Sequence, residues 1–206
     1  MDTKGVNDME SRIIEAAKQV FVRKGYEAAT MSDVATEAGI GRTALHYYYR
    51  TKEILFDAIF GQLMAALLPN INRIMELDKP MLEKIPLVIE QYIELIKKNP
   101  LFPVFVINEL NRDPLHLFRV VMKEPERIRP IQKLRAQIER EMELGVIRKM
   151  PVEDLVTTIV SLVVFPMLIR QPLSAAFWGG DLNQFEEFMN RRHDLIVGIV
   201  TQMLKI

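Results

Sequence analysis

The sequence predicts an all-α protein. Apolar residues recur at the three- and four-residue spacing of amphipathic helices along most of the chain, and no convincing run alternates between apolar and polar residues as a strand would. Glycine and proline divide these periodic segments, as they do at helix ends. With 206 residues, of which 49% are hydrophobic and 26% charged, the chain has a globular composition and enough apolar material for a sizeable core.

The first predicted helix runs from Asp8 to Lys24, and its apolar residues between Ile13 and Phe21 fall on one face. Gly25 directly follows this segment and fits the left-handed backbone position just beyond a helix end. We therefore expect the chain to turn at Gly25.

Two short helices follow and are joined by a glycine turn. The first begins at Thr30, and Asp33 stands three residues later, as in a capping box. Gly39 ends this helix and allows the positive backbone angle of a tight turn. The second short helix runs from about Arg42 to Tyr49. This is a helix-turn-helix pattern spanning about residues 31–50, although such helix pairs also occur in proteins that do not bind DNA.

The remaining elements are longer. A fourth helix, capped by Thr51, continues to Leu67 and is expected to be interrupted by Pro69. Pro172 and the Gly179–Gly180 pair predict a loop before the last helix. The other expected helices are Met81–Lys98, Val104–Asn111, a segment that ends at Glu143, Pro151–Arg170 and Asp181–Leu204.

The second short helix has the face that major-groove recognition requires, because one side is apolar around Leu45 and the other is polar. Arg42 can donate two hydrogen bonds to guanine, and Thr43 can contact a base, a methyl group or a phosphate. Tyr48 fits the core better than a DNA contact. His46 and Tyr47 can donate hydrogen bonds to phosphate oxygens, and Arg42, Arg50 and Lys52 supply positive charge with no acid between them.

Several function classes are excluded or disfavoured. The chain has no cysteine, which removes disulfides, thiolate metal sites and cysteine nucleophiles, and its net charge of zero argues against a nonspecific nucleic-acid coat. His46, His116 and His193 lack the spacing of metal ligands. No glycine-rich phosphate loop, HExxH motif or nucleophile elbow is present. We expect neither enzymatic activity, nor a cofactor, nor a metal.

The termini and the apolar segments predict a cytoplasmic protein with no membrane partner. The polar N-terminus, MDTKGVNDMESR, does not have the pattern of a signal peptide. The most apolar stretch, Leu155–Ile169, is shorter than the roughly 20 residues of a membrane span and contains polar residues and a proline. A buried or interface helix is the better interpretation.

The stretch RIIEAAKQVFVRKGYEAATMSDVATEAGIGRTALHYYYRTKEILFDAI resembles the DNA-binding region of the tetracycline-repressor (TetR) family. The resemblance covers about the first quarter of the chain. It implies a DNA-binding domain at residues 8–68 and a larger helical domain at residues 69–206 that binds an effector and forms a homodimer. The implied DNA contacts are Thr30, Arg42, Thr43, His46, Tyr47, Tyr48 and Lys52, with Thr30 and Lys52 on phosphates.

Two residues of the recognition helix depart from the family pattern. The family often has tyrosine where His46 stands, and glycine followed by serine or threonine where Thr43 and Ala44 stand. The base preferences of relatives therefore do not transfer to this chain. The implied function is a repressor of a near-palindromic operator that a small, largely apolar ligand releases. A regulator of the same fold that answers to a protein partner is the alternative.

The last two long helices carry apolar stripes, and two helices from each of two subunits would make a four-helix interface. These stripes could also pack within one subunit. The candidate interface residues are Leu155, Ile159, Val163, Phe185, Met189, Ile196, Ile199 and Met203.

The effector pocket is the least specified site, because methionine and phenylalanine at helical spacing are more often core residues than ligand contacts. Glu109 could recognise a cation and Arg112 an anion, although helix capping or an interdomain salt bridge is the more ordinary role for both. The candidate pocket residues are Tyr92, Phe102, Phe105, Glu109, Phe118, Met122 and Phe165.

Overall fold

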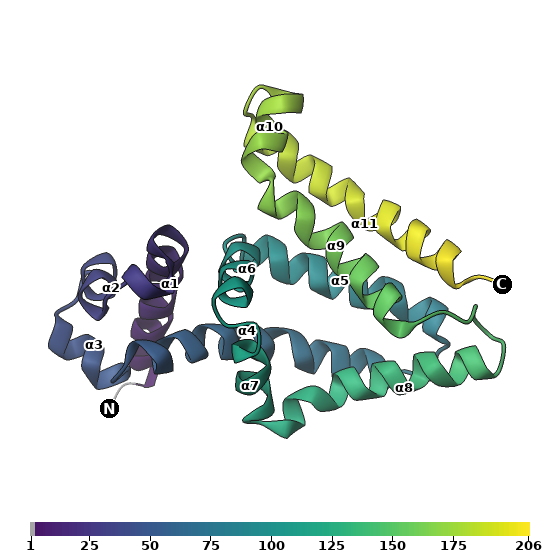
Figure 1. Cartoon of the computed structure of the whole chain (residues 1–206), viewed down its shortest axis with the longest axis horizontal. Coiled ribbons are helices and arrows are strands. Elements are labelled where there is room, and N and C mark those ends of the chain that lie inside the picture. The colour runs from purple at the N-terminus through teal and green to yellow at the C-terminus, as the bar shows by residue number, and fades with distance from the viewer. Residues whose placement is uncertain (1–2) are drawn as a thin grey trace. The chain divides into compact units, whose positions relative to one another are not determined.

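The computed structural model describes residues 3–206, and the side chains of residues 8–124 and 126–206. The described residues form helices and no strand, which confirms the all-α prediction (Figure 1). The elements are α1 (Thr3–Ala28), α2 (Met31–Glu37), α3 (Arg42–Tyr48), α4 (Lys52–Met75), α5 (Met81–Lys98), α6 (Phe102–Arg112), α7 (His116–Met122), the short 3-10 helix η1 (Pro125–Ile128), α8 (Arg129–Glu143), α9 (Val152–Leu168), α10 (Arg170–Trp178) and α11 (Leu182–Leu204).

Two expectations about helix boundaries were wrong. Helix α4 does not stop at Pro69 but continues to Met75, because a proline removes one internal hydrogen bond without preventing the helix from propagating on either side. The segment between the last two long helices is not a loop but the nine-residue helix α10. Pro172 lies in its first turn, where a missing N–H is tolerated, and Gly179, with φ of 59°, ends it.

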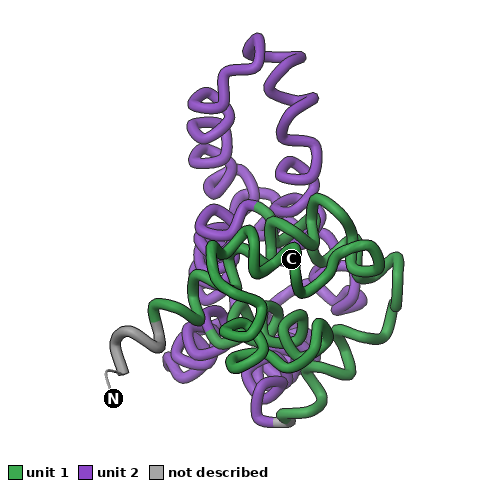
Figure 2. Tube along the Cα trace, turned by 90° about the vertical axis from the view of Figure 1, so that its left-hand side faces the viewer, with its two compact units in different colours: residues 1–65, 101–125 green, residues 66–100, 126–206 purple. Residues whose placement is uncertain are grey.

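The chain forms two compact units, which Figure 2 colours separately. The first comprises residues 1–65 and 101–125, and the second comprises residues 66–100 and 126–206. Packing therefore groups α6 and α7 with the N-terminal helices. The functional division expected at residue 68 stays a prediction, since these units record only which helices pack together.

The first unit is built around the apolar face of α1 that the sequence predicts. Ile13 and Val20 of α1 are fully buried, as are Leu45 of α3 and Ile59 of α4. Phe56 of α4 connects these helices to α6, because its ring stacks on the Phe105 ring with centroids 4.4 Å apart. Burying such aromatic side chains contributes about 2–3 kcal/mol each relative to exposure. The helix-turn-helix thus shares its core with α6.

The second unit is held by α5, which contacts α8, α9 and α11. Two buried charged side chains join helix ends at the start of α5. Glu141 of α8 accepts hydrogen bonds from the backbone N–H of Met81 at 3.0 Å, which caps a helix whose N-cap is a proline. Lys84 donates to the carbonyl oxygen of Met75 at the end of α4. Charged groups at helix ends satisfy backbone atoms that have no partner inside the helix.

Helix α4 is long and apolar enough to cross a membrane by length and composition alone. The core helices of water-soluble proteins meet the same criteria. Leu55, Ile59 and Leu63 of α4 are buried against other helices of the first unit. Core packing therefore accounts for the apolar character of α4.

Candidate nucleic-acid interface

Helix α2 begins at the capping box that the sequence predicts. The Thr30 hydroxyl accepts a hydrogen bond from the Asp33 N–H at 3.1 Å, and the Asp33 carboxylate accepts one from the Thr30 N–H at 3.0 Å. Lys24 of α1 also donates to Asp33 at 2.7 Å. The hydrogen bond from Lys24, followed by those from Thr30, lowers the pKa of Asp33 to about 2. The start of α2 is thereby tied to α1.

The turn between α2 and α3 is held by an arginine that the sequence did not reveal. Gly39 has φ of 61°, in the left-handed region that favours glycine. The Arg12 guanidinium donates to the carbonyl oxygens of Ala38 at 2.8 Å and of Gly39 at 3.1 Å. A Cβ atom at Gly39 would lie 3.0 Å from Arg12 Nη2. The turn therefore requires glycine for its backbone angle and for this close approach.

Helix α3 buries one side and exposes the other. Leu45 is fully buried, whereas Arg42, Thr43 and Tyr47 are exposed, with Tyr47 exposing 80% of its surface. His46 lies between its helix neighbours, since Arg42 Nε donates to His46 Nε2 at 3.4 Å and His46 Nδ1 lies 3.2 Å from the Arg50 carbonyl oxygen. The ring of the half-buried Tyr48 lies nearly perpendicular to that of Tyr47, with their centres 5.4 Å apart. The exposed side thus carries donors suited to base edges and phosphates.

Lys52 has an additional structural role that the sequence did not indicate. Its ammonium donates to the carbonyl oxygens of Tyr26 at 2.6 Å, Ala29 at 3.0 Å and Glu27 at 3.2 Å. It also lies 4.4 Å from the centre of the Tyr26 ring. These contacts join the start of α4 to the end of α1, beside Thr30. They use the three N–H donors of the Lys52 ammonium, so the predicted phosphate contact would have to share these donors with the carbonyl oxygens.

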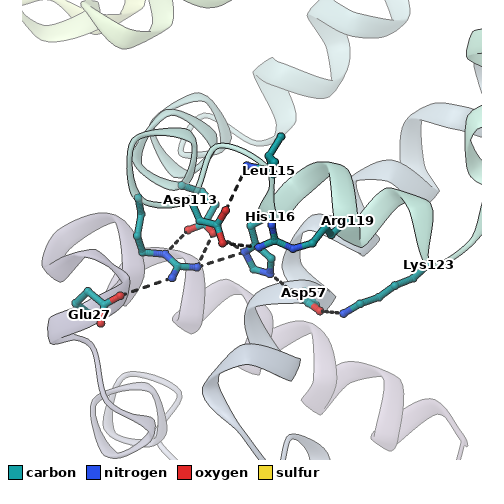
Figure 3. Close-up of polar contacts among 9 residues, drawn as sticks. Glu27, Asp57, Asp113, Leu115, His116, Arg119 and Lys123 are labelled. Carbon is teal, nitrogen blue, oxygen red and sulfur yellow. Dashed lines mark hydrogen bonds and ion pairs between the residues drawn. The ribbon is translucent and has the colours of Figure 1, made fainter.

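A partly buried cluster of charged side chains in the first unit was not predicted from the sequence, although a salt bridge was an expected role for Glu109 (Figure 3). Arg112 donates to both Glu109 oxygens, at 2.8 and 2.6 Å, and its guanidinium lies 4.0 Å from the centre of the Tyr26 ring. The hydrogen bond to Glu109 is the main reason that the pKa of Arg112 is raised. His116 Nδ1 contacts Glu109, and His116 Nε2 lies 3.0 Å from Asp57 Oδ1.

We call Asp57, Glu109, Arg112 and His116 the ion cluster. Glu109 and His116 are buried, at 1% and 6% exposure, so their polar atoms depend on partners within the protein rather than on water. The cluster joins α4, α6 and α7, and the stacking of Arg112 on Tyr26 extends it to the end of α1. The sequence did not reveal the whole ion cluster, because Asp57 lies 52 residues before Glu109, the nearest of the other three members.

The predicted effector-pocket residues are divided between the two units, and the pocket stays a prediction. Phe105 and Glu109 line a pocket of about 380 Å³ in the first unit. Phe102 is buried in the same unit but does not line this pocket. Phe118 and Met122 of the same unit are exposed, and so is Phe165 of the second unit, which does not fit a closed pocket. Tyr92 belongs to the second unit, where burial raises its pKa to about 12.

The predicted interface residues lie on two sides of their helices. Five of them are already buried inside the second unit of the single chain. Ile159 and Met203 are half-buried. Ile199 is exposed, together with Val156, Val160 and Leu195 on the same two helices. The sequence stripes thus mix core and surface, because a 3.6-residue period does not show where the core face ends. The five buried residues are Leu155, Val163, Phe185, Met189 and Ile196.

Comparisons with known proteins agree with the helix-turn-helix. Residues 13–59 match the family described as "Bacterial regulatory proteins, tetR family". An uncharacterized HTH-type transcriptional regulator of Bacillus subtilis, YhgD, is 26% identical over 162 residues, which cover 79% of this chain and 83% of that protein.

Solved structures share the fold of the whole chain. A putative fatty acid metabolism regulator of Clostridium perfringens has a TM-score of 0.73 at 20% identity and covers 95% of this chain and 99% of its own. The regulator FadR of Bacillus subtilis, solved in complex with stearoyl-CoA, has a TM-score of 0.63 at 20% identity and covers 91% and 97%. With the match over residues 13–59, these findings show that the chain contains a tetR-type helix-turn-helix region and is similar to HTH-type transcriptional regulators.

Proposed function

We propose that the chain is a cytoplasmic, homodimeric repressor that binds a near-palindromic DNA operator and leaves it when a small, largely apolar ligand binds. The observation that carries the DNA-binding part is the exposed face of α3, where Arg42, Thr43 and Tyr47 stand on a helix that Leu45 anchors. The turn before it is clamped by Arg12, so the recognition helix is presented rigidly. A rigid helix with an arginine near its start suits major-groove reading.

Dimerisation supplies the second recognition helix. Helices α9 and α11 lie side by side in the second unit (Figure 1). They carry exposed apolar side chains at Val156, Val160, Leu195 and Ile199. Apolar side chains clustered on the surface favour association with a like surface. Two recognition helices about 34 Å apart would enter successive major grooves.

The ion cluster supports a route by which a ligand could act on DNA binding. Helix α6 is joined to the end of α1 by the stack of Arg112 on Tyr26, and Tyr26 in turn is held by Lys52 beside α2. A ligand that displaced α6 would therefore act on the segment that positions the helix-turn-helix. Such coupling requires the ligand to bind one arrangement better than the other.

DNA footprinting of the upstream region of the protein's own gene, over a series of salt concentrations, tests the DNA-binding proposal. We expect a protected near-palindrome whose affinity falls steeply with salt. Arg42→Ala should lose about 1–3 kcal/mol of binding free energy if Arg42 reads a base. Arg129→Ala, in the exposed first turn of α8, is the matched control and should bind as the wild type does.

Two results would contradict the proposal. Loss of the same size in both arginine variants would mean that α3 is not the reading helix. A folded dimer that protects no DNA at low salt, either upstream of its gene or after selection from random sequences, would refute DNA binding. A folded dimer that binds DNA but is released by no small molecule would favour the protein-partner alternative.

A further inference from the structure

A pocket of about 340 Å³ lies in the second unit, where the end of α5 meets α9, α10 and α11. Met167, Phe185 and Met189 form its apolar lining, and methionine adapts its shape readily to a bound apolar group. Its volume lies at the lower end of the range of small-molecule sites, about 300–1,000 Å³. None of the effector-pocket residues predicted from the sequence lines it.

Helix α10 buries two polar groups that lack partners among the described residues, and one of them, on Arg170, lies at this pocket. Arg170, the first residue of α10, lines the pocket, and its Nε atom is buried without a hydrogen-bond partner among the described residues. Ser174 stands one helical turn later on the same face, is 1% exposed, and its Oγ likewise has no partner in the part of the chain that the structure describes. Buried donors are costly unless an acceptor satisfies them.

The charges around the pocket indicate which acceptor fits. Arg170 and Lys97 both line it. Lys97 pairs with Glu94 at 2.9 Å, whereas the acid nearest Arg170 is Glu186, whose side chain is 70% exposed and whose oxygen lies 3.8 Å from Arg170 Nη2. At that distance and exposure the ion pair is weak. A better-buried anion would replace Glu186 and form the two parallel hydrogen bonds that guanidinium makes with carboxylate.

We propose that this pocket binds a small apolar molecule bearing one carboxylate, with the apolar body on Met167, Phe185 and Met189 and the carboxylate on Arg170. Binding at this place stands independently of the proposed function. The use of the pocket as an effector site rests on the proposed function, because only a DNA-binding regulator has an operator to release.

The chain contains a built-in reporter for this site. Trp178 is its only tryptophan, and its ring lies at the other end of α10 with its centre 6.4 Å from that of Phe185. The probe is decanoate below its micellar concentration, and decanol is the neutral analogue of equal chain length. We expect a saturable change in tryptophan fluorescence, with decanoate binding at least tenfold more tightly than decanol.

Three variants and a control test the role of Arg170. Arg170→Met should weaken decanoate binding at least tenfold and leave decanol binding unchanged, and Arg170→Lys should lose part of the preference because lysine keeps the charge but not the fork of donors. Glu186→Gln should bind decanoate more tightly than the wild type, since the competing acid is gone. This variant keeps the test decisive if the Arg170 variants fail to fold. Arg129→Met, at an exposed arginine of α8, should behave as the wild type.

Equal affinity for decanoate and decanol in the wild type would overturn the proposal, as would decanoate binding that neither Arg170→Met nor Glu186→Gln alters. Absence of a saturable signal, with calorimetry also detecting no binding, would overturn it too. Operator release is measured separately. If decanoate binds without altering operator occupancy, the pocket is a binding site but not an effector site. If the protein binds no operator, the proposed function is refuted, and the fluorescence result still shows whether the pocket binds decanoate.

Discussion

Removing Arg112 tests whether the ion cluster stabilises the first unit. In the variant Arg112→Met, the Glu109 carboxylate loses its guanidinium partner and keeps the contact with His116, in a site where the Glu109 side chain is 1% exposed. Breaking a fully buried pair costs about 3–5 kcal/mol. Because the Arg112 side chain is 28% exposed and His116 remains, we expect a loss of about 2–3 kcal/mol in the free energy of unfolding.

The assay is urea unfolding followed by far-UV circular dichroism, with Arg119→Met as the matched control. Like Arg112, Arg119 pairs with a nearby carboxylate, that of Asp113, but the Arg119 side chain is 53% exposed. An exposed ion pair contributes about 0–1 kcal/mol, so the control should lose clearly less. The double variant Glu109→Leu/Arg112→Met should recover most of the stability, because it leaves no unpaired charge at Glu109. Equal losses in the two single variants would refute the reasoning.

Three further predictions concern the turn, the cap and the dimer. Gly39→Ala should lose about 1–2 kcal/mol of unfolding free energy because its φ is positive, and Gly41→Ala, at φ of −72°, should lose less in the same urea assay. The hydrogen bonds from Lys24 and Thr30 lower the pKa of Asp33 from its ordinary value of 3.8 to about 2, so the stabilisation they give is present above pH 3.8 and lost as pH falls towards 2. Asp33→Asn should remove that part of the acid-unfolding curve, and an unchanged curve would contradict the cap. Ile199→Asp should sediment as a monomer while Phe177→Asp, at an exposed site on α10, stays dimeric, and a dimeric Ile199→Asp would exclude this face.

The local features of the fold were predictable because they depend on neighbours in the sequence. Thr30 and Asp33 form the predicted capping box, and Gly39 has the positive φ that the turn required. Helix α10 was missed because Pro172 and the glycine pair were taken for a loop, although a proline in a first turn is compatible with a helix.

Contacts between distant segments could not be predicted from one sequence. Nothing near Arg12 indicates that it clamps the carbonyls 26 and 27 residues later, and nothing near Lys52 indicates its carbonyl contacts at the end of α1. The apolar stripes of α9 and α11 have a related ambiguity, because periodicity identifies an apolar face but not which part of it the same chain covers. Leu155 is inside, whereas Val156 beside it is outside.

The grouping of α6 and α7 with the helix-turn-helix has a consequence for the engineering of chimeric regulators. A graft that exchanges everything after residue 68 would separate Phe56 from Phe105, whose rings stack at 4.4 Å, and would leave Asp57 without His116. The helices that replace α6 and α7 would then have to pack against Phe56 and Asp57, whose native partners are absent. A functional hybrid should instead take residues 1–65 and 101–125 from one parent, so that the helix-turn-helix keeps the helices that pack with it in the first unit.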